Sequence, residues 1–287
     1  MIRETKLFSG KQVSEEIDNK LKADIQRLTG EGINPVLGIV RIGEKSDDAA
    51  YERGATKRAE KIGIKVKNYR YDADIPQETL VEEIRKINSD TDVHGVLLLR
   101  PLPAHIDEKI VCGELVPSKD IDGITETSMA GVYSGFGLGY PPCTAAACVE
   151  ILKSYGVEIK GKKAVVIGRS LVIGKPVAMM LLKEDATVTV CHTKTIDMPK
   201  ICKEAEILIV ATGKAKSIGT EYFNKDQIVI DVGINADDDG NLCGDVDFAA
   251  AEGYVKAITP VPGGVGTVTT GILMRHVVQA ASVSSNR

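Results

Sequence analysis

The sequence has no apolar segment of about 18 residues, the length that a transmembrane helix requires. Its first residues, MIRETKLFSGKQ, contain no apolar core of the kind found in signal peptides. It also has no basic run, and its formal net charge is −4, so neither nucleic acid nor an anionic membrane is an expected partner. We therefore expect a cytoplasmic protein without membrane association.

The patterns that bind metals or form disulfide frameworks are missing as well. None of the six cysteines forms a C-x-x-C pair, and the four histidines show no H-E-x-x-H spacing. The cysteines are Cys112, Cys143, Cys148, Cys191, Cys202 and Cys243, and the histidines are His94, His105, His192 and His276. We expect free thiols in a reducing compartment and no metal site.

The composition is that of an ordinary globular protein. The 287 residues are 43% hydrophobic and 26% charged, with no internal repeat and no low-complexity segment. A chain of this length is sufficient for about two domains.

One stretch, KAVVIGRSLVIGKP, organises the chain. Lys163–Ile167 is a short, β-branched apolar run, typical of a buried strand. A turn with Gly168 follows, and an apolar helical pattern starts at Gly174, with Pro176 suited to its first turn. A strand, a glycine turn and a helix start can direct free backbone N–H groups at a phosphate. The spacing differs from G-x-G-x-x-G, and a strand-to-helix turn without a ligand remains the alternative.

Periodicity predicts the other elements. In the first half we expect helices at Ser9–Leu28, Ala49–Lys61 and Pro76–Ile87, and strands at Val36–Ile42, Val66–Tyr71 and Gly95–Leu99. In the second half we expect helices at Thr144–Tyr155 and Val268–Val283, and further strands at Thr187–Cys191, Ile207–Ala211, Ile228–Val232 and Val255–Ile258. The β-α-β-α-β order of the first half indicates a parallel sheet, and Thr144 is a plausible N-cap.

These elements predict an α/β protein with two domains bridged by two long helices. The N-terminal α/β substrate domain comprises residues 1–143 and 267–287, and the C-terminal Rossmann-like nucleotide-binding domain comprises residues 144–266. A cleft between two such domains is the expected ligand site.

Four stretches carry a resemblance to a known family. They are Tyr51 with its helix, Pro101–Gly123 with KDIDG, the GRSLVIGKP turn, and TPVPGGVGTVT from Thr259 to Thr269. In this order the chain resembles the methylenetetrahydrofolate dehydrogenase/cyclohydrolase family over about Leu7 to Ala281. The resemblance implies oxidation of 5,10-methylenetetrahydrofolate to 5,10-methenyltetrahydrofolate with hydride transfer to NADP or NAD, and in most members hydrolysis to 10-formyltetrahydrofolate. It also implies a homodimer paired through the nucleotide-binding domains.

The resemblance assigns the folate site. Asp122 matches the aspartate that binds the pterin, and a carboxylate can accept two hydrogen bonds from a 2-amino-4-oxo pyrimidine ring. Tyr51 matches the active-site tyrosine. A turn-capping Asp and a half-buried helical Tyr are the alternatives. The expected catalytic residues are Tyr51 and Asp122; the expected substrate-binding residues are Tyr51, Ala55, Leu98, Leu99, Arg100, Asp122, Pro262, Gly263, Gly264, Val265 and Gly266.

Two positions depart from the family's pattern. The family has a lysine four residues after the tyrosine, where this chain has Ala55, and a glutamine where it has Leu99. Lys57 lies on another face of the helix, and strand alternation sends Leu99 and Arg100 to opposite faces. Water attack on the methenyl carbon needs acid–base help. We therefore expect a dehydrogenase with weak or absent cyclohydrolase activity; compensation by Arg100 is the alternative.

The nucleotide is expected to be NADP rather than NAD. No carboxylate follows the strand that ends at Cys191, where NAD-binding domains place one. Arg169 and Thr193 match family positions near a 2′-phosphate. The expected cofactor-binding residues are Gly168, Arg169, Ser170, Gly174, His192, Thr193, Gly233 and Ile234. Thr267 replaces a helix-starting proline of the family and is expected to cap the last helix.

Three other interpretations remain. The chain can be fully bifunctional, or it can be a folate or nucleotide binder that has lost both activities. A related two-domain dehydrogenase, such as one acting on shikimate, would lack KDIDG and PGGVG at these places.

Overall fold

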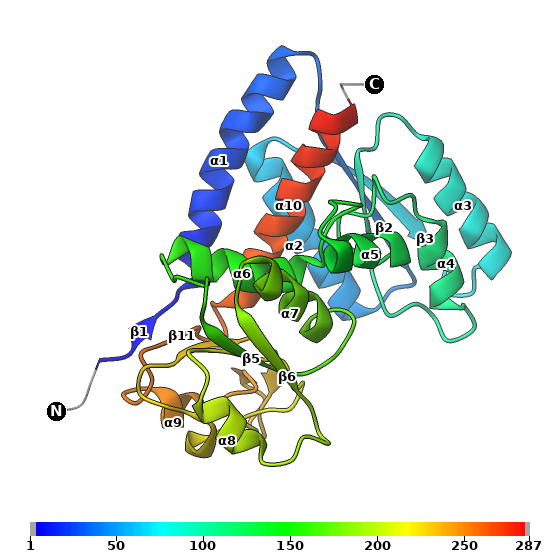
Figure 1. Ribbon diagram of the computed structural model, residues 1–287. Coiled ribbons are helices and arrows are strands. Elements are labelled where there is room, and N and C mark those ends of the chain that lie inside the picture. The colour runs from blue at the N-terminus through cyan, green and yellow to red at the C-terminus, as the bar shows by residue number, and fades with distance from the viewer. Residues whose placement is uncertain (1–3, 285–287) are drawn as a thin grey trace. The chain divides into compact units, whose positions relative to one another are not determined.

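The computed structural model describes residues 4–284 and divides into two compact units (Figure 1). The C-terminal unit comprises residues 4–15 and 144–269, and the N-terminal unit comprises residues 16–143 and 270–284. The division falls inside the first and the last helix, α1 (Gly10–Gly30) and α10 (Val265–Ser284), so each of them contributes residues to both units. Within residues 4–284, none of the helices combines the length and the apolar composition that crossing a membrane requires.

The N-terminal unit is built on a parallel sheet of three strands in the order β3-β2-β4. The strands are β2 (Val36–Ile42), β3 (Lys65–Tyr71) and β4 (Gly95–Leu98), and the connecting helices are α2 (Ser46–Ile62) and α3 (Gln77–Ser89). The predicted β-α-β-α-β order and the parallel sheet are confirmed. Leu80, Ile84 and Ile87, one apolar face of α3, pack into the core with Val40 and Leu98 from the sheet.

Two short helices lie in the segment after β4, where periodicity predicted neither a helix nor a strand. They are α4 (Glu108–Glu114) and α5 (Glu126–Ser134). Each has a side-chain N-cap, because Asp107 accepts hydrogen bonds from Lys109 N and Ile110 N and Thr125 accepts one from Ser128 N. Their amphipathic patterns are too short to be distinguished from the surrounding turns.

The C-terminal unit contains a parallel sheet of six strands in the order β1-β11-β8-β7-β5-β6. The strands are β1 (Lys6–Leu7), β5 (Lys163–Ile167), β6 (Thr187–Cys191), β7 (Ile207–Val210), β8 (Ile228–Asp231) and β11 (Ala257–Ile258). The sequence did not predict β1, whose two residues pair with β11 from the far end of the chain (Figure 1). A hairpin of β9 (Asn235–Ala236) and β10 (Leu242–Cys243) also escaped prediction.

The remaining helices of this unit are short, apart from α6 and α7. They are α6 (Cys143–Ser154), α7 (Gly174–Lys183), α8 (Met198–Lys203), α9 (Phe248–Ala251) and the 3₁₀ helix η1 (Thr220–Tyr222). Pro176 lies in the first turn of α7, as predicted. The predicted N-caps Thr144 and Thr267 are wrong, because α6 begins at Cys143 and α10 at Val265, which places both threonines inside helices.

Candidate functional site

Hydrogen bonds to the carboxylate of a second aspartate fix the turn that carries Asp122. The carboxylate of the fully buried Asp120 accepts hydrogen bonds from Ile124 N at 2.9 Å, Thr125 N at 2.8 Å and the Ser128 hydroxyl at 2.6 Å. This carboxylate therefore ties the KDIDG turn to the start of α5. Asp122 thus lies on a turn whose backbone is held by hydrogen bonds.

Asp122 has an unusual environment for a carboxyl group. Burial raises its pKa to about 6, although the Cys143 thiol and the Arg100 guanidinium act in the opposite direction. Asp120 adds to the increase. Gly123 has φ +69° and packs so closely on the backbone of residues 140–142 that a side chain would collide with it. The Asp-Gly pair thus serves the turn and leaves the Asp122 side chain available to a ligand.

A buried Cys–His pair lies beneath the same turn. The Cys143 sulfur is 3.2 Å from the Ile121 carbonyl oxygen and 3.6 Å from His276 Nδ1. His276 Nδ1 lies 2.8 Å from that carbonyl, so the ring donates from Nδ1. Burial lowers the pKa of His276 to about 4, and the ring is therefore neutral at physiological pH. Sequence reasoning missed this pair, because no spacing rule connects positions 133 residues apart.

Tyr51 lies on α2 and is electrostatically coupled to this group. Its side chain is partly open, with the residue 41% exposed. Burial of the hydroxyl raises the pKa of Tyr51, with further contributions from the Asp122 carboxylate and Cys143. The hydroxyl therefore stays protonated and can donate a hydrogen bond near Asp122. Two of the residues predicted from sequence, Tyr51 and Asp122, are thus close enough for the charge of one to raise the pKa of the other.

The two positions that depart from the family's pattern are apolar and buried. Ala55, one turn after Tyr51 on α2, is 1% exposed, and Leu99, just after β4, is 7% exposed. Leu99 N donates to the Val40 carbonyl at 3.0 Å, and its neighbour Leu98 is buried in the core. Neither position offers a group that can accept or donate a proton.

Two cationic side chains, those of Arg100 and Lys45, lie near the carboxyl end of β4. Arg100 forms an ion pair with Glu108 at 3.1 Å, and the other oxygen of Glu108 accepts from Leu102 N. Lys45, which sequence reasoning did not single out, donates from Nζ to the Pro101 carbonyl at 3.0 Å. Both side chains come from segments that follow parallel strands, the usual edge for ligand sites in such sheets.

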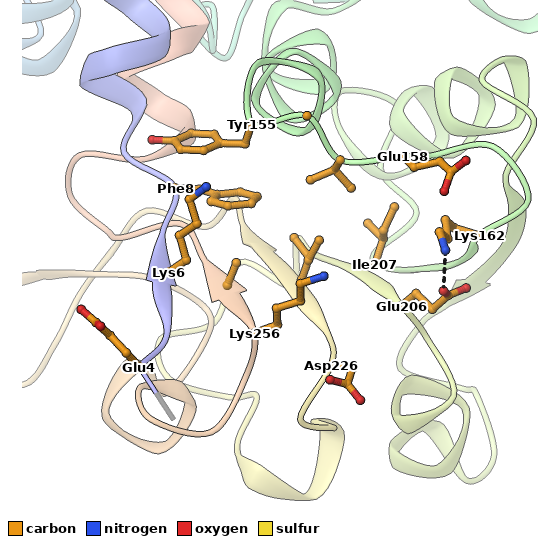
Figure 2. A pocket seen from close by; sticks show the side chains of 14 residues that line it. Glu4, Lys6, Phe8, Tyr155, Glu158, Lys162, Glu206, Ile207, Asp226 and Lys256 are labelled. Atoms are coloured by element: carbon orange, nitrogen blue, oxygen red, sulfur yellow. Dashed lines mark ion pairs between the residues drawn. The ribbon is translucent and has the colours of Figure 1, made fainter. Parts of the chain in front are cut away.

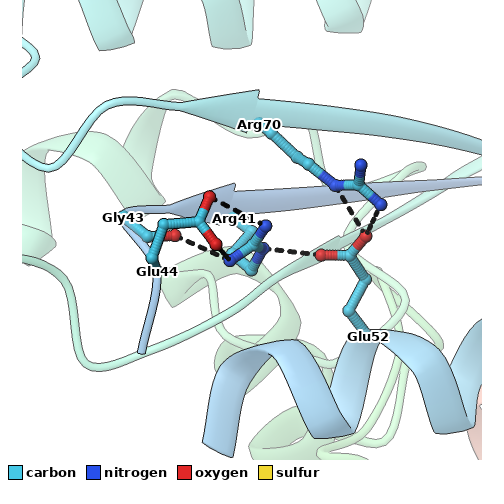
Figure 3. Close-up of polar contacts among 5 residues, drawn as sticks. All are labelled: Arg41, Gly43, Glu44, Glu52 and Arg70. Atoms are coloured by element: carbon cyan, nitrogen blue, oxygen red, sulfur yellow. Dashed lines mark hydrogen bonds and ion pairs between the residues drawn. The ribbon is translucent and has the colours of Figure 1, made fainter. Parts of the chain in front are cut away.

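A buried ion-pair network anchors the start of α2 beside Tyr51 (Figure 3). Glu52 pairs with Arg41 Nε at 2.6 Å and with Arg70 Nη2 at 2.5 Å. Arg41 also reaches Glu44 at 2.9 Å and the Gly43 carbonyl at 2.8 Å (Figure 3). The network joins β2, β3 and α2, and so fixes the helix that carries Tyr51.

In the C-terminal unit, the glycine turn has the predicted strand–turn–helix geometry. Gly168 has φ +127°, and a side chain there would collide with the Ala211 carbonyl. Gly174 packs against the backbone of Gly168. Ser170 Oγ accepts from Ile173 N at 3.1 Å and from Gly174 N at 3.4 Å, while Arg169 points outward and is exposed. The exposed guanidinium suits an anionic ligand, whereas the N–H groups of Ile173 and Gly174 are already bound to Ser170.

The residues directly after β6 include no carboxylate, as the sequence indicated. His192 Nδ1 accepts from Lys194 N at 3.1 Å, and His192 N donates to Thr195 Oγ1 at 2.9 Å. The imidazole therefore accepts a hydrogen bond within the turn after β6, as expected for a residue that packs at the end of a strand. Thr193 is exposed and free of a carboxylate neighbour in sequence.

A small cavity of about 140 Å³ lies where β8 and β11 end. It is lined by the loop with Gly233 and Ile234 and by the stretch Pro262–Gly266. The side chain of Ile234 is largely exposed. These seven residues were predicted as ligand contacts, and the structure gathers them around one cavity.

A larger cavity, of about 550 Å³, lies at the amino ends of the strands of the same sheet (Figure 2). Phe8 and Tyr155 stack there with ring centroids 4.1 Å apart, and Lys162 pairs with Glu206 at 3.1 Å (Figure 2). Its walls are the amino ends of β7, β8 and β11. Because ligands of parallel α/β sheets bind outside the carboxyl ends of the strands, we do not place the nucleotide in this cavity.

The fold and the glycine turn define a two-domain α/β protein with a Rossmann-like nucleotide-binding unit. The family model "Tetrahydrofolate dehydrogenase/cyclohydrolase, catalytic domain" matches residues 8–122, and the model "Tetrahydrofolate dehydrogenase/cyclohydrolase, NAD(P)-binding domain" matches residues 142–285. The chain belongs to the tetrahydrofolate dehydrogenase/cyclohydrolase family. The resemblance carried by the KDIDG, GRS and PGGVG motifs is confirmed, and so is the fold class.

Relatives match over nearly the full chain. The "Bifunctional protein FolD" of Clostridioides difficile (strain 630) is 47% identical over 281 residues, which cover 98% of each chain. The solved structure of the bifunctional FolD enzyme from Campylobacter jejuni has a TM-score of 0.94 at 36% identity and covers 97% of this chain and 99% of its own. The FolD structure from Trypanosoma brucei, complexed with NADP cofactor and inhibitor, has a TM-score of 0.92 at 33% identity and covers 99% of this chain and 100% of its own.

Proposed function

We propose that the protein oxidises 5,10-methylenetetrahydrofolate to 5,10-methenyltetrahydrofolate, with hydride transfer to NADP, and that its cyclohydrolase activity is weak or absent. Membership of the family and the FolD names of its relatives support the dehydrogenase half of this proposal. We also infer a homodimer paired through the nucleotide-binding domains, which rests on the family resemblance alone. A cytoplasmic location is inferred from the composition and the cysteine pattern.

Asp122 and Tyr51 have the central roles in folate binding. The Asp122 carboxylate accepts two hydrogen bonds from the pterin's amino group and ring N–H, and charge-assisted bonds of this kind are strong. The Tyr51 hydroxyl, protonated because its pKa is raised, donates to the bound folate or to an ordered water. Arg100, which lies in the same unit as Tyr51 and Asp122, supplies a further polar contact.

The dinucleotide is assigned to the carboxyl edge of the six-stranded sheet. The glycine turn after β5 faces its phosphates, and Arg169 with Thr193 donates to the 2′-phosphate. The solved NADP complex of a relative supports NADP as the cofactor. NAD remains the alternative, and a direct comparison of kcat/KM for the two dinucleotides decides between them.

The observation that carries the loss of cyclohydrolase activity is the burial of Ala55 and Leu99 as apolar residues. Hydride transfer requires alignment of donor and acceptor, whereas water attack requires proton transfer, which contributes about 10²–10⁴-fold. Arg100 is no substitute, because its guanidinium stays protonated and is paired with Glu108. Lys45 is held on the Pro101 carbonyl and is the one amine in this region that needs a direct test.

One preparation assayed for both reactions tests the proposal. We expect formation of reduced NADP from methylenetetrahydrofolate and little acceleration of methenyltetrahydrofolate hydrolysis. The double variant Ala55→Lys/Leu99→Gln should gain hydrolysis by about 10²-fold or more. Ala50→Lys, which places the same amine about 140° around α2 at an exposed position, is the matched control and should gain none.

Three outcomes would change the conclusion. Hydrolysis by the wild type at a rate comparable to its dehydrogenase step would establish a fully bifunctional enzyme. If that hydrolysis disappears in Lys45→Ala, Lys45 is the compensating amine. Absence of reduced NADP in the first assay would leave a folate- or nucleotide-binding protein without activity.

A further inference from the structure

Two aspartates lie buried where the six-stranded sheet meets its ligand-side loops. Asp231 ends β8 and is 2% exposed, and Asp245 follows the β9–β10 hairpin and is 0% exposed. Within residues 4–284, neither carboxylate forms an ion pair with a Lys, Arg or His side chain. Buried charges without such partners are costly unless hydrogen bonds satisfy them.

Asp245 is satisfied by donors from two separate loops. Its carboxylate accepts from Thr212 N at 2.6 Å, Gly213 N at 3.0 Å and Lys214 N at 2.9 Å, which form the loop after β7. It also accepts from Asn235 Nδ2 at 2.9 Å, which belongs to the loop after β8. One side chain thus ties the two loops together.

Asp231 extends the connection to a third loop. Its carboxylate accepts from Asp245 N at 3.0 Å and Val246 N at 3.1 Å. Its own backbone N donates to Thr259 Oγ1 at 2.8 Å, and that hydroxyl lies 3.3 Å from the Asp231 carbonyl. Thr259 directly precedes the loop that contains Pro262–Gly266. The Asp245 carboxylate therefore connects the loops after β7 and β8. Asp231 joins this group through its carboxylate and reaches the segment after β11 through its backbone.

Two glycines show how closely this arrangement is packed. A side chain at Gly233 would overlap the Asp245 carboxylate, and a side chain at Gly244 would overlap that of Asp231. Gly233 was predicted as a cofactor contact. Independently of any cofactor, this position must be a glycine, because the Asp245 carboxylate occupies the space that a side chain would take. The position of the loop with Ile234 is consequently set by the carboxylate beneath it.

We propose that Asp231 and Asp245 are positioning residues of the dinucleotide site. They hold the Gly233–Ile234 backbone and the Pro262–Gly266 loop at the spacing that forms the cavity of about 140 Å³. This inference rests on the proposed function, since it assigns that cavity to the nicotinamide side of the dinucleotide. Neither side chain needs to touch the dinucleotide, because each acts through the loop backbone that it binds.

Isosteric amides test the proposal. In Asp245→Asn the new NH₂ group faces backbone N–H donors, so the loops must separate. We expect the Kd for NADP, measured by titration calorimetry, to rise at least about tenfold, while the KM for methylenetetrahydrofolate at saturating NADP changes less than about twofold. Asp231→Asn should act in the same direction. Asp247→Asn, two positions on, is the matched control, because that side chain caps α9 and should leave the Kd unchanged.

A milder variant distinguishes weaker NADP binding from misfolding. Asn235→Ala removes one donor at 2.9 Å and leaves both carboxylates in place, and it should raise the Kd for NADP about threefold or more. An unchanged Kd for NADP in folded Asp245→Asn, or equal losses for folate and NADP, would overturn the proposal. The binding measurement does not depend on turnover. Wild-type protein that binds NADP without oxidising methylenetetrahydrofolate would refute the proposed function and leave the positioning test intact.

Discussion

Two regions of the molecule, the anchor of α2 and the loops beside β8, satisfy a buried carboxylate in opposite ways. In the N-terminal unit, Glu52 is neutralised by two arginines, Arg41 and Arg70 (Figure 3). In the C-terminal unit, Asp231 and Asp245 have only N–H donors. The first arrangement joins a helix to two strands, and the second joins loops to one another.

The difference has consequences for both stability and proton binding. Glu52 is held by two cationic side chains, so this arrangement is expected to behave as a fixed anchor for α2. Backbone amides compensate burial less completely. Burial raises the pKa of Asp231 to about 7, against the effect of the N–H groups that bind it. The loops that Asp231 joins are therefore expected to respond to pH near 7.

The largest expected effect comes from breaking the anchor. Glu52→Gln removes the buried carboxylate partner of Arg41 and leaves it with the exposed Glu44, so we expect the free energy of unfolding to fall by about 3–5 kcal/mol. Urea denaturation followed by circular dichroism measures it. Glu44→Gln removes a carboxylate from the same network, but that side chain is 85% exposed, so the change should stay below about 1 kcal/mol. Equal effects of the two variants would show that burial does not distinguish the two pairs.

A smaller effect, and one that depends on pH, is expected at Asp231. Its folded pKa of about 7 lies above the unfolded value near 4, so the folded state binds more protons between these values. The resulting stabilisation is complete below the unfolded pKa and is lost as the pH rises through 7. Relative to Asp231→Asn, the wild type should therefore lose about 1–3 kcal/mol of stability between pH 5 and pH 8. A difference between the two proteins that stays constant over this range would contradict the assignment.

The smallest effect is expected at Cys143. Its thiol lowers the pKa of Asp122, so Cys143→Ala should move the acidic limb of kcat/KM for the folate, near pH 6, upward by less than about one unit. Cys148→Ala is the matched control. That thiol is also buried, but it donates to the Thr144 carbonyl instead, and the limb should stay where it is. A shift in the control alone would assign the limb to another group.

Local patterns were enough to predict most of the fold. Val36–Ile42 and Lys163–Ile167 have the predicted bounds, because continuous β-branched runs are seldom anything but buried strands. The two-residue strand β1 and the capped helix α4 were missed. The first exists only through its pairing with β11, and the second has a single turn of apolar spacing. Such elements depend on tertiary contacts that a window along the chain does not contain.

The candidate site was predictable only where a motif marks it. KDIDG and the GRS turn indicated Asp122 and Gly168, and the structure gives both the expected turns. The contacts that hold these turns were not visible. Cys143 meets His276, and Glu52 meets Arg41 and Arg70, across separations that obey no period. Charge and burial in such groups are set by the fold as a whole, so the residues that support a site are harder to find than the residues that form it.

The contact between Gly244 and Asp231 has a consequence for directed evolution. Because the glycine leaves space that the carboxylate fills, a mutagenesis library that varies one position at a time would reject every side chain at 244. Libraries that pair a shorter side chain at 231 with alanine at 244 would explore combinations that single substitutions never reach. Attempts to retune the dinucleotide preference of this chain should therefore begin with coupled changes beneath the loop.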